Sequence, residues 1–577
     1  MNTIPLSNSY AFSHYSHTKI FKSQPTFITR NSQKDTNIPA PNESRNLPSN
    51  LSLLEKIFNK AIIKFLDHPP HLSVDPCNTL TDNFAPVDEL SPTKCEDVYG
   101  SLPSCLDGVY IRNGPNPQFI SSGPQHYLDG DGMVHSIRIS QGCATFCSRY
   151  IKTNKYLFEN QVKSSIVPNF IGGMKGLGPF VARAALFYAR IILGKYDISK
   201  GIGVANTNLA FFGGSLYAHY KKFVALCESD LPYALKVEDN GDVITLHQHD
   251  FKGKLFMNMT AHPKIDPKTK EAFAFRYWAT YPYITYFRFD ANGDKQTDVP
   301  IFSMKEPSLT HDLAITQKYA IICDIQLGAH PMNLIRKGSL ISFDKMKVPR
   351  IGVLPRYAKD ESEIKWFEVP GLNILHVANA WDETDEYGSE VLVLVAPNTL
   401  SIEHFFDRMD LIQPSMEKVT IHFGTGVVLR QTLSVDNMEF PVINPAYISK
   451  KNKFVYTAIH EKTPKKSRMI RTIGVAKLDI AASEGTKERH EYTVASRMYG
   501  DNCFGGEPFF VARDSSVEED DGYLVSYVHD ENSGESRFLV MDARSPNLEV
   551  VAVVKLPQRV PYGLHGLFIK EKDLSAM

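Results

Sequence analysis

The sequence shows no excess of charge of either sign. Its 577 residues include 63 Lys and Arg against 64 Asp and Glu, a formal net charge of −1. A protein that binds nucleic acid needs a broad basic surface to displace counterions from the phosphates. We therefore expect no nucleic-acid partner, and the composition is that of an ordinary globular chain.

Motifs for organic cofactors, nucleotides and zinc fingers are missing as well. The sequence contains no Rossmann glycine pattern, no Walker loop and no nucleophile elbow. The eight cysteines are scattered, and the close pair Cys143 and Cys147 has no second pair at zinc-finger spacing. We expect reduced, mostly buried thiols and no organic cofactor.

The N-terminal segment lacks acidic side chains. Residues 1–34 contain ten Ser or Thr and four Lys or Arg, and the first acidic residue is Asp35. This composition is typical of an organellar transit peptide, and an ordinary disordered tail is the alternative. Residues 35–50 are rich in Pro, Asn and Ser and are interpreted as a linker.

Two segments have the periodicity of amphipathic helices, but neither is long or clean enough to span a bilayer. The first is a helix over 51–68 with an apolar stripe through 51–66, and the second lies in a helical insertion near 169–197, where Arg183 and Arg190 interrupt the apolar run. Such segments pack against the protein's own core or lie in a membrane interface, here through 51–66 and 170–195. The pattern alone favours neither.

From about residue 100 onward, short strand-like runs separated by turn residues dominate the sequence. Asn-Gly pairs at Asn240 and Asn292 each lie between two such runs, which is typical of β-hairpins. The 52 residues between them approach the length of one four-stranded propeller blade. The sequence therefore predicts an all-β domain, either a propeller or a barrel.

Four of the 19 histidines share a local context. His262, His311, His376 and His565 each lie at or near the end of a strand-like run, among small or apolar neighbours. A buried imidazole needs a partner, and for a single histidine a hydrogen bond to backbone or water is the simpler explanation. Their spacings of 49, 65 and 189 residues also suit ligands that different blades deliver to a common axis.

A series of ordered motifs covers the chain from about residue 80 to its C-terminus. They include GVYIRNGPNPQF, YLDGDGMVHSIRI, NMTAHPKIDP, HDLAIT, GLNILHVANAWDE, NMEFPVINPAY, RMYGDNCFGGEPFFVARD and PQRVPYGLHGLFI. In these motifs the sequence resembles the carotenoid cleavage oxygenases, most closely the plastidial type-4 dioxygenases of plants. The resemblance implies an all-β domain over 80–577, a seven-bladed β-propeller with a small helical, membrane-facing cap.

The resemblance also implies a metal site. It assigns one Fe(2+) per chain to four histidines, which would act catalytically through the iron: His262, His311, His376 and His565. Imidazole suits ferrous iron, and four ligands on an octahedral ion leave two positions for dioxygen and solvent. Three glutamates would accept the outward N–H of three histidines and orient them. The implied pairs are Glu228 with His311, Glu439 with His376, and Glu507 with His565.

The sequence departs from the family pattern at three places near these residues. Close relatives often have Asp where Glu439 stands, and Phe is common where Leu313 and Leu564 stand. We expect the two leucines to reshape the cavity near the iron without touching the ligands.

The implied reaction is cleavage of one C=C bond of a carotenoid by O2, at the 9,10 and/or 9',10' position, giving apocarotenoid aldehyde or ketone products. A carotenoid is almost insoluble in water, so the enzyme must collect it from a membrane or plastoglobule surface, and the N-terminus points to a plastid, either chloroplast or chromoplast. The alternatives are cleavage of another bond or of an apocarotenoid, a four-His isomerase, and a carotenoid-binding propeller without activity. A hydrolytic zinc enzyme fits less well, because catalytic zinc has three protein ligands and a water.

Overall fold

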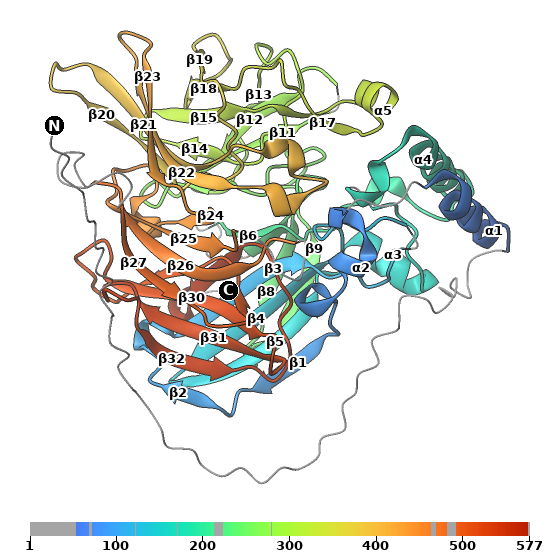
Figure 1. Cartoon of the computed structure of the whole chain (residues 1–577), viewed down its shortest axis with the longest axis horizontal. Coiled ribbons are helices and arrows are strands. Elements are labelled where there is room, and N and C mark those ends of the chain that lie inside the picture. Colours follow the sequence, from blue (N-terminus) through green and yellow to red (C-terminus); the bar gives the residue numbers. More distant parts are fainter. Residues whose placement is uncertain are drawn as a thin grey trace, which may run out of the picture. The chain divides into compact units, whose positions relative to one another are not determined.

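The computed structural model describes residues 53–67, 72–121, 123–169, 171–212, 223–278, 280–462, 469–481 and 492–574. The predicted transit peptide (1–34) and linker (35–50) lie outside these ranges. Strands dominate the described residues (Figure 1), which confirms the all-β class. Within the same ranges, none of the helices combines the length and the apolar character needed to cross a bilayer.

The first sheet joins the two ends of the described chain, because its last strand, β33, pairs antiparallel with β3. Its strands, in the order β1-β5-β4-β3-β33, are β1 (Leu90–Lys94), β5 (Cys143–Tyr150), β4 (Gly132–Ser140), β3 (Gly108–Pro115) and β33 (Gly566–Lys570). The C-terminal strand thus completes a sheet that the N-terminal strands began.

Four four-stranded sheets follow along the chain, each antiparallel throughout. The first two are β6 (Asn208–Phe211), β7 (Phe223–Leu226), β8 (Tyr233–Val237) and β9 (Val243–Gln248), then β10 (Lys264–Ile265), β11 (Ala272–Tyr277), β12 (Ile284–Phe289) and β13 (Val299–Pro300). The next two are β14 (Leu313–Ile315), β15 (Tyr319–Asp324), β18 (Arg350–Pro355) and β19 (Lys365–Glu368), then β20 (Asn379–Thr384), β21 (Glu390–Thr399), β22 (Pro414–His422) and β23 (Val428–Ser434). A small hairpin, β16 (Leu327–Ala329) and β17 (Ile341–Phe343), stands apart.

The remaining strands form one ten-stranded sheet with two four-stranded parts. The first part is β24 (Met438–Val442), β25 (Phe454–His460), β26 (Thr472–Asp479) and β27 (Thr493–Met498), and the second is β29 (Phe509–Ala512), β30 (Gly522–Asp530), β31 (Glu535–Asp542) and β32 (Val550–Lys555). Strand β28 (Cys503–Gly505) bridges β26 and β30, and β2 (Val98–Gly100) adds an edge beside β32. The chain therefore forms seven successive antiparallel units, one five-stranded sheet and six four-stranded units.

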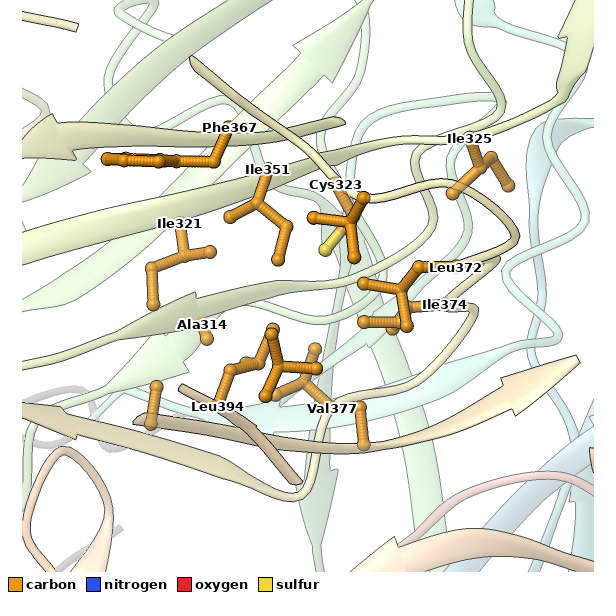
Figure 2. Close-up of a cluster of buried hydrophobic side chains, with 14 of the residues drawn as sticks. Ala314, Ile321, Cys323, Ile325, Ile351, Phe367, Leu372, Ile374, Val377 and Leu394 are labelled. Carbon is orange, nitrogen blue, oxygen red and sulfur yellow. The ribbon is translucent and has the colours of Figure 1, made fainter. Parts of the chain in front are cut away.

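The core is divided among clusters that lie between neighbouring units. Figure 2 shows the cluster between the β14–β19 and β20–β23 sheets, where Ile321 and Ile351 lie on one side and Leu394 on the other. Corresponding clusters join each unit to the next, and the one containing Tyr527 and Tyr110 packs the last unit against the first. Burial of about 25 cal/mol per Å² of apolar surface in these clusters is what holds the sheets face to face.

Both predicted Asn-Gly hairpins are present. Gly241 lies between β8 and β9 and Gly293 between β12 and β13, with φ of +87° and +75°. Glycine adopts these left-handed angles without the steric cost that a Cβ would bring. The two hairpins belong to successive sheets, as their spacing suggested.

Helices are few, and two of them correspond to the amphipathic segments. The α-helices are α1 (Leu53–Ala61), α2 (Pro76–Thr79), α3 (Asn154–Val162), α4 (Leu177–Ile192), α5 (Pro331–Lys337) and α6 (Glu571–Leu574). A π-helical turn (Ile62–Leu66) continues α1. Short 3-10 turns cover Leu72–Val74, Asp82–Phe84, Ser104–Leu106, Gly172–Met174, Ile198–Lys200, Ile402–His404, Met409–Leu411 and Pro445–Tyr447.

The two arginines that interrupt the second apolar run join it to the first. Arg183 in α4 contacts Asp67 at 2.6 Å, and Arg190 contacts Glu55 in α1 at 3.1 Å. Helices α1 and α4 therefore lie together (Figure 1), and we call residues 53–67 and 177–193 the helical cap.

Candidate metal centre

Each of the four histidines lies within three residues of the start of a strand, and the four strands belong to different sheets. His262 lies two residues before β10, His311 two before β14 and His376 three before β20, and His565 directly precedes β33. Strand β10 contacts β14, and β14 contacts β20. The four imidazoles meet, and one nitrogen of each lies within 4.8 Å of the others.

The rings face one another edge-on. The ring centroids of His262 and His311 lie 4.5 Å apart, those of His262 and His565 also 4.5 Å, and those of His376 and His565 5.0 Å. The Nε2 atoms of His262 and His311 are 3.0 Å apart. This arrangement directs ring nitrogens, rather than ring faces, into one small space.

The three glutamates lie beside the histidines with which they were expected to pair. Nδ1 of His311 is 2.7 Å from Glu228, which lies between β7 and β8. Nδ1 of His376 hydrogen-bonds Glu439 in β24 at 2.9 Å. These contacts occupy Nδ1, so Nε2 of each ring is left to face the centre.

In the third pair, His565 and Glu507, both oxygens of the carboxylate accept a hydrogen bond. Nδ1 of His565 hydrogen-bonds Oε1 of Glu507 at 2.9 Å, and the backbone N–H of Gly566 donates to Oε2 of the same carboxylate at 2.9 Å. Both the ring and the backbone of this segment are therefore fixed by one side chain. Among the described residues, His262 has no carboxylate against its ring.

Burial and neighbouring charges set the protonation of the group. Burial holds the pKa of His262 well below its usual range, and the three other histidines reinforce this effect. Burial also lowers the pKa of His565, against the opposing charge of Glu507. Neutral imidazole is the form that binds a metal.

The His376–Glu439 pair behaves differently. Burial acts to lower the pKa of His376, but the charge and hydrogen bond of Glu439 outweigh it and raise that pKa. Burial likewise acts to raise the pKa of Glu439, and His376 outweighs it and lowers that pKa. The carboxylate is therefore charged, which makes the imidazole in front of it a stronger electron donor.

A cavity lies beside the segment that carries His376. The His376 side chain keeps 14% of its accessible surface. A mostly apolar cavity of about 170 Å³ lies next to this segment. Its lining includes Lys264, Ala314, Val377 and Phe510, which come from the first strands of the sheets or the residues beside them.

The two unusual leucines are placed differently from each other. Leu313 is completely buried in the cluster with Phe273 and Ile322, so its side chain adds no surface to a cavity beside the histidines. Leu313 could therefore affect the cavity only through the residues packed around it, and its effect on the cavity stays a prediction. Leu564 keeps 9% of its surface and directly precedes His565.

Three residues that the sequence did not single out also belong to the site. The ring of Phe440 lies 5.4 Å from that of His376 and 5.5 Å from that of His565, on a backbone with φ of +53°. A phenylalanine with positive φ is uncommon, and here the hydrogen bond from the N–H of Phe440 to Glu439 holds this backbone conformation. The other two residues, Thr260 and Asp312, link the histidine-bearing segments to one another.

Comparison with known proteins decides the family. The family model described as RPE65, retinal pigment epithelial membrane protein, matches residues 84–570. The chain belongs to this family, that of RPE65 and the carotenoid cleavage oxygenases. The resemblance inferred from the sequence motifs is thereby confirmed.

Two similar relatives are plant proteins. The chain is 55% identical over 521 residues to a probable carotenoid cleavage dioxygenase 4, chloroplastic, of Arabidopsis thaliana, covering 89% of this chain and 84% of that one. It is 51% identical to the 9-cis-epoxycarotenoid dioxygenase NCED1, chloroplastic, of rice (Oryza sativa subsp. japonica), covering 91% of this chain and 80% of that one.

Solved structures share the fold at lower identity. A lignostilbene dioxygenase of Pseudomonas brassicacearum superimposes with a TM-score of 0.70 at 21% identity, covering 87% of this chain and 100% of that one. A cobalt-substituted apocarotenoid oxygenase of Synechocystis gives a TM-score of 0.66 at 24% identity, covering 86% and 99%.

The four-histidine group of this carotenoid cleavage oxygenase has the features of a metal site. Its four nitrogen donors converge from four sheets, and Nε2 of His376 is buried with no hydrogen-bond partner among the described residues. A buried polar atom without a partner costs about 1–3 kcal/mol. Imidazole nitrogens suit iron, zinc, copper and nickel, so the residues fit a transition metal.

Replacement of Glu507 by glutamine tests the carboxylate behind His565. Both oxygens accept hydrogen bonds, so the amide NH2 of glutamine must face either His565 or Gly566, each of which is a donor. We expect metal affinity to fall about 10–100-fold, measured by competition with a chelator. Glu417→Gln is the control, because Glu417 is a buried carboxylate bound to Arg430 on β22 and β23, and unchanged affinity in Glu507→Gln would contradict the role.

Proposed function

We propose that His262, His311, His376 and His565 bind one ferrous ion, and that with it the protein cleaves a C=C bond of a carotenoid using O2. The observation that supports this is the convergence of four imidazoles with carboxylates behind three of them. The named relatives are carotenoid cleavage dioxygenases, so oxidative cleavage of a carotenoid into carbonyl products is the activity of the family to which the chain belongs.

The side chains around the site have separable tasks. Glu228, Glu439 and Glu507 hold a proton at Nδ1 of their histidines and thereby orient Nε2 toward the metal. When bound, the ferrous ion supplies the activation of dioxygen. Phe440 covers one side of the group with an aromatic ring, which keeps water from that side and offers an apolar contact to a polyene.

The contribution of the protein to catalysis is positioning of the substrate rather than acid–base chemistry. Holding one double bond of a long polyene beside the metal turns a bimolecular reaction into an effectively intramolecular one, which accounts for a large part of the rate enhancement of an enzyme. We propose cleavage at the 9,10 and/or 9',10' position. Relatives named for this position are 38–39% identical, and one named for 7,8(7',8') cleavage is 48% identical, so analysis of the products must decide.

We further propose that residues 80–577 form a seven-bladed β-propeller. Support comes from the seven antiparallel units, one of five strands and six of four, from the core clusters between successive units, and from β33 completing the first sheet. In that architecture the four histidines lie on the axis, at the entry to the innermost strand of four blades.

The helical cap is proposed as the lipid-docking surface. Of its apolar stripe, Ile57, Phe58, Phe65 and Leu66 are exposed, as are Ile192 and Leu193 at the end of α4. The arginines between them are paired with acids of the cap rather than free. A surface that leaves this much apolar area in water suits a membrane or plastoglobule, and the relatives named chloroplastic support a plastid location reached through the 1–34 transit peptide.

Acidic substitutions in the cap test the docking surface. Phe65, Ile192 and Leu193 are 73%, 70% and 70% exposed, so the triple change to Asp should leave folding intact. Each buried apolar side chain contributes about 1.5–3 kcal/mol, so we expect sedimentation with phosphatidylcholine–galactolipid vesicles to fall at least about 10-fold. Val517→Asp, at an 86% exposed position outside the cap, is the control. Equal vesicle binding by the triple variant would exclude the cap.

The cleavage reaction is tested directly with purified protein. Iron is quantified, and products from several carotenoids are analysed with ¹⁸O₂ and without oxygen. We expect two carbonyl fragments per cleavage, oxygen consumption, and no product under anaerobic conditions. A product with the mass of the substrate and no oxygen consumption would favour a four-His isomerase, and unchanged substrate would favour a carotenoid-binding protein.

A further inference from the structure

The carboxylate of Asp312 joins three separate segments of the chain. Its Oδ1 accepts the backbone N–H of Leu313 at 2.7 Å. Its Oδ2 accepts the backbone N–H of Val377 at 2.9 Å and the ammonium of Lys264 at 2.8 Å. Only 2% of the side chain is accessible, so all three donors are satisfied inside the protein.

Each linked position lies immediately after one of the histidines. Lys264, Asp312 and Val377 follow His262, His311 and His376 by two, one and one residues. The carboxylate therefore binds together the starts of three strands in three different sheets. A displacement of any of these strands would change the spacing of the nitrogens that face the metal.

A second set of hydrogen bonds links the segments that carry His262 and His311. The hydroxyl of Thr260 donates to the backbone carbonyl of His311 at 3.1 Å and accepts the backbone N–H of His262 at 3.0 Å. His262 is the histidine whose ring contacts no carboxylate in the described ranges. Its position depends on its backbone, and so on Thr260 and on the ion pair two residues later.

We propose that Asp312 is a positioning residue of the metal centre, which fixes the spacing of His262, His311 and His376 through Lys264 and the Val377 N–H. The inference rests on the proposed metal site and extends it. A buried ion pair contributes little net stability, because desolvation offsets the attraction. Charge-assisted hydrogen bonds do fix geometry, and this pair fixes it beside three ligands.

Lys264 adds a second reason for the arrangement. Lys264 also lines the 170 Å³ cavity, as do Ala314 and Val377. The residues that the ion pair joins therefore include two that line this cavity, Lys264 and Val377.

Asp312→Asn is the decisive variant. Asparagine keeps the size of the side chain, but its NH2 must face one of the three donors, so at least one tie is lost. We expect Fe(II) affinity, measured by competition with a chromophoric chelator, to fall at least about 10-fold. In protein reconstituted with Co(II), we expect the visible absorption to change, because it reports ligand geometry. Turnover should fall while KM for the carotenoid stays constant.

Asp131→Asn is the matched control. Asp131 is a buried carboxylate paired with Lys155 at 2.8 Å that also accepts a backbone N–H, from Gln118, and it contacts none of the histidines. It should leave Fe(II) affinity and the Co(II) spectrum unchanged. If Asp312→Asn does not fold, two variants of Lys264 replace it. Lys264→Gln must weaken Fe(II) binding, and Lys264→Arg, which keeps the positive charge, must retain most of the wild-type affinity.

The outcomes separate this inference from the proposed function. Wild-type affinity and spectrum in folded Asp312→Asn would overturn the positioning role while leaving the metal site intact. A wild-type protein that binds no Fe(II) would contradict both.

Discussion

His376→Ala should reduce bound iron to less than about a tenth of one ion per chain and abolish carotenoid cleavage. The variant removes one of four converging nitrogens and leaves Glu439 a buried carboxylate without its imidazole partner. Losing a group that only supports a ligand already lowers metal affinity about 10–100-fold, and loss of the ligand itself should exceed this. Metal analysis of the purified variant and product analysis in parallel provide the measurement.

A buried histidine away from the site serves as the control for this variant. His529 in β30 is 5% exposed, and its Nδ1 contacts Ser536 at 2.9 Å. His529→Ala should cost stability without losing iron. Full iron content and activity in His376→Ala would eliminate the four-histidine assignment.

Gly563→Ala should disturb the loop that carries His565, although it touches no ligand. A Cβ at this position would lie 2.6 Å from Nε of Arg112 and 2.9 Å from the carbonyl oxygen of Asn113. Neither atom can retreat, because Arg112 is fully buried, donates to the Pro561 carbonyl and packs on a tyrosine ring. The loop that carries His565 must therefore shift.

We expect Gly563→Ala to lower the free energy of unfolding by about 1–3 kcal/mol and to weaken iron binding at least about 10-fold. Thermal unfolding with and without iron separates the two effects, because a pure stability loss would appear equally in both. Gly424→Ala is the matched control, since its Cβ would meet nothing within 4 Å and its φ is ordinary. Iron affinity equal to wild type would show that the loop tolerates the shift.

Local sequence predicted the local structure well. The Asn-Gly turns at Gly241 and Gly293 need positive φ, which glycine provides, so the hairpins follow from a few neighbouring residues. The amphipathic segments became α1 and α4 because a helix is specified by its own periodicity. Their partner was not predictable, since the pairing of Arg183 with Asp67 depends on how two distant segments meet.

The candidate site residues were predictable from ordered family motifs, but not from the physical properties of each residue and its neighbours. A histidine between apolar residues, such as His376, has the same local sequence whether its ring binds water or iron. Only its place among four ordered motifs distinguished the two possibilities. Phe440 and Asp312 gave no such signal. Their roles depend on a left-handed backbone and on contacts across sheets, which no single strand encodes.

The sequence by itself determined the strands, their turns, the family and the identity of seven candidate site residues, because each depends on a short run of chain or on ordered motifs. Only the tertiary structure decided that Leu313 lies in the core rather than at the cavity, that the two helices share one cap, and that Asp312 joins three histidine-bearing strands. The physical reason is that these features are contacts between residues far apart in the chain. Their distances are set by the packing of whole sheets and not by the residues alone.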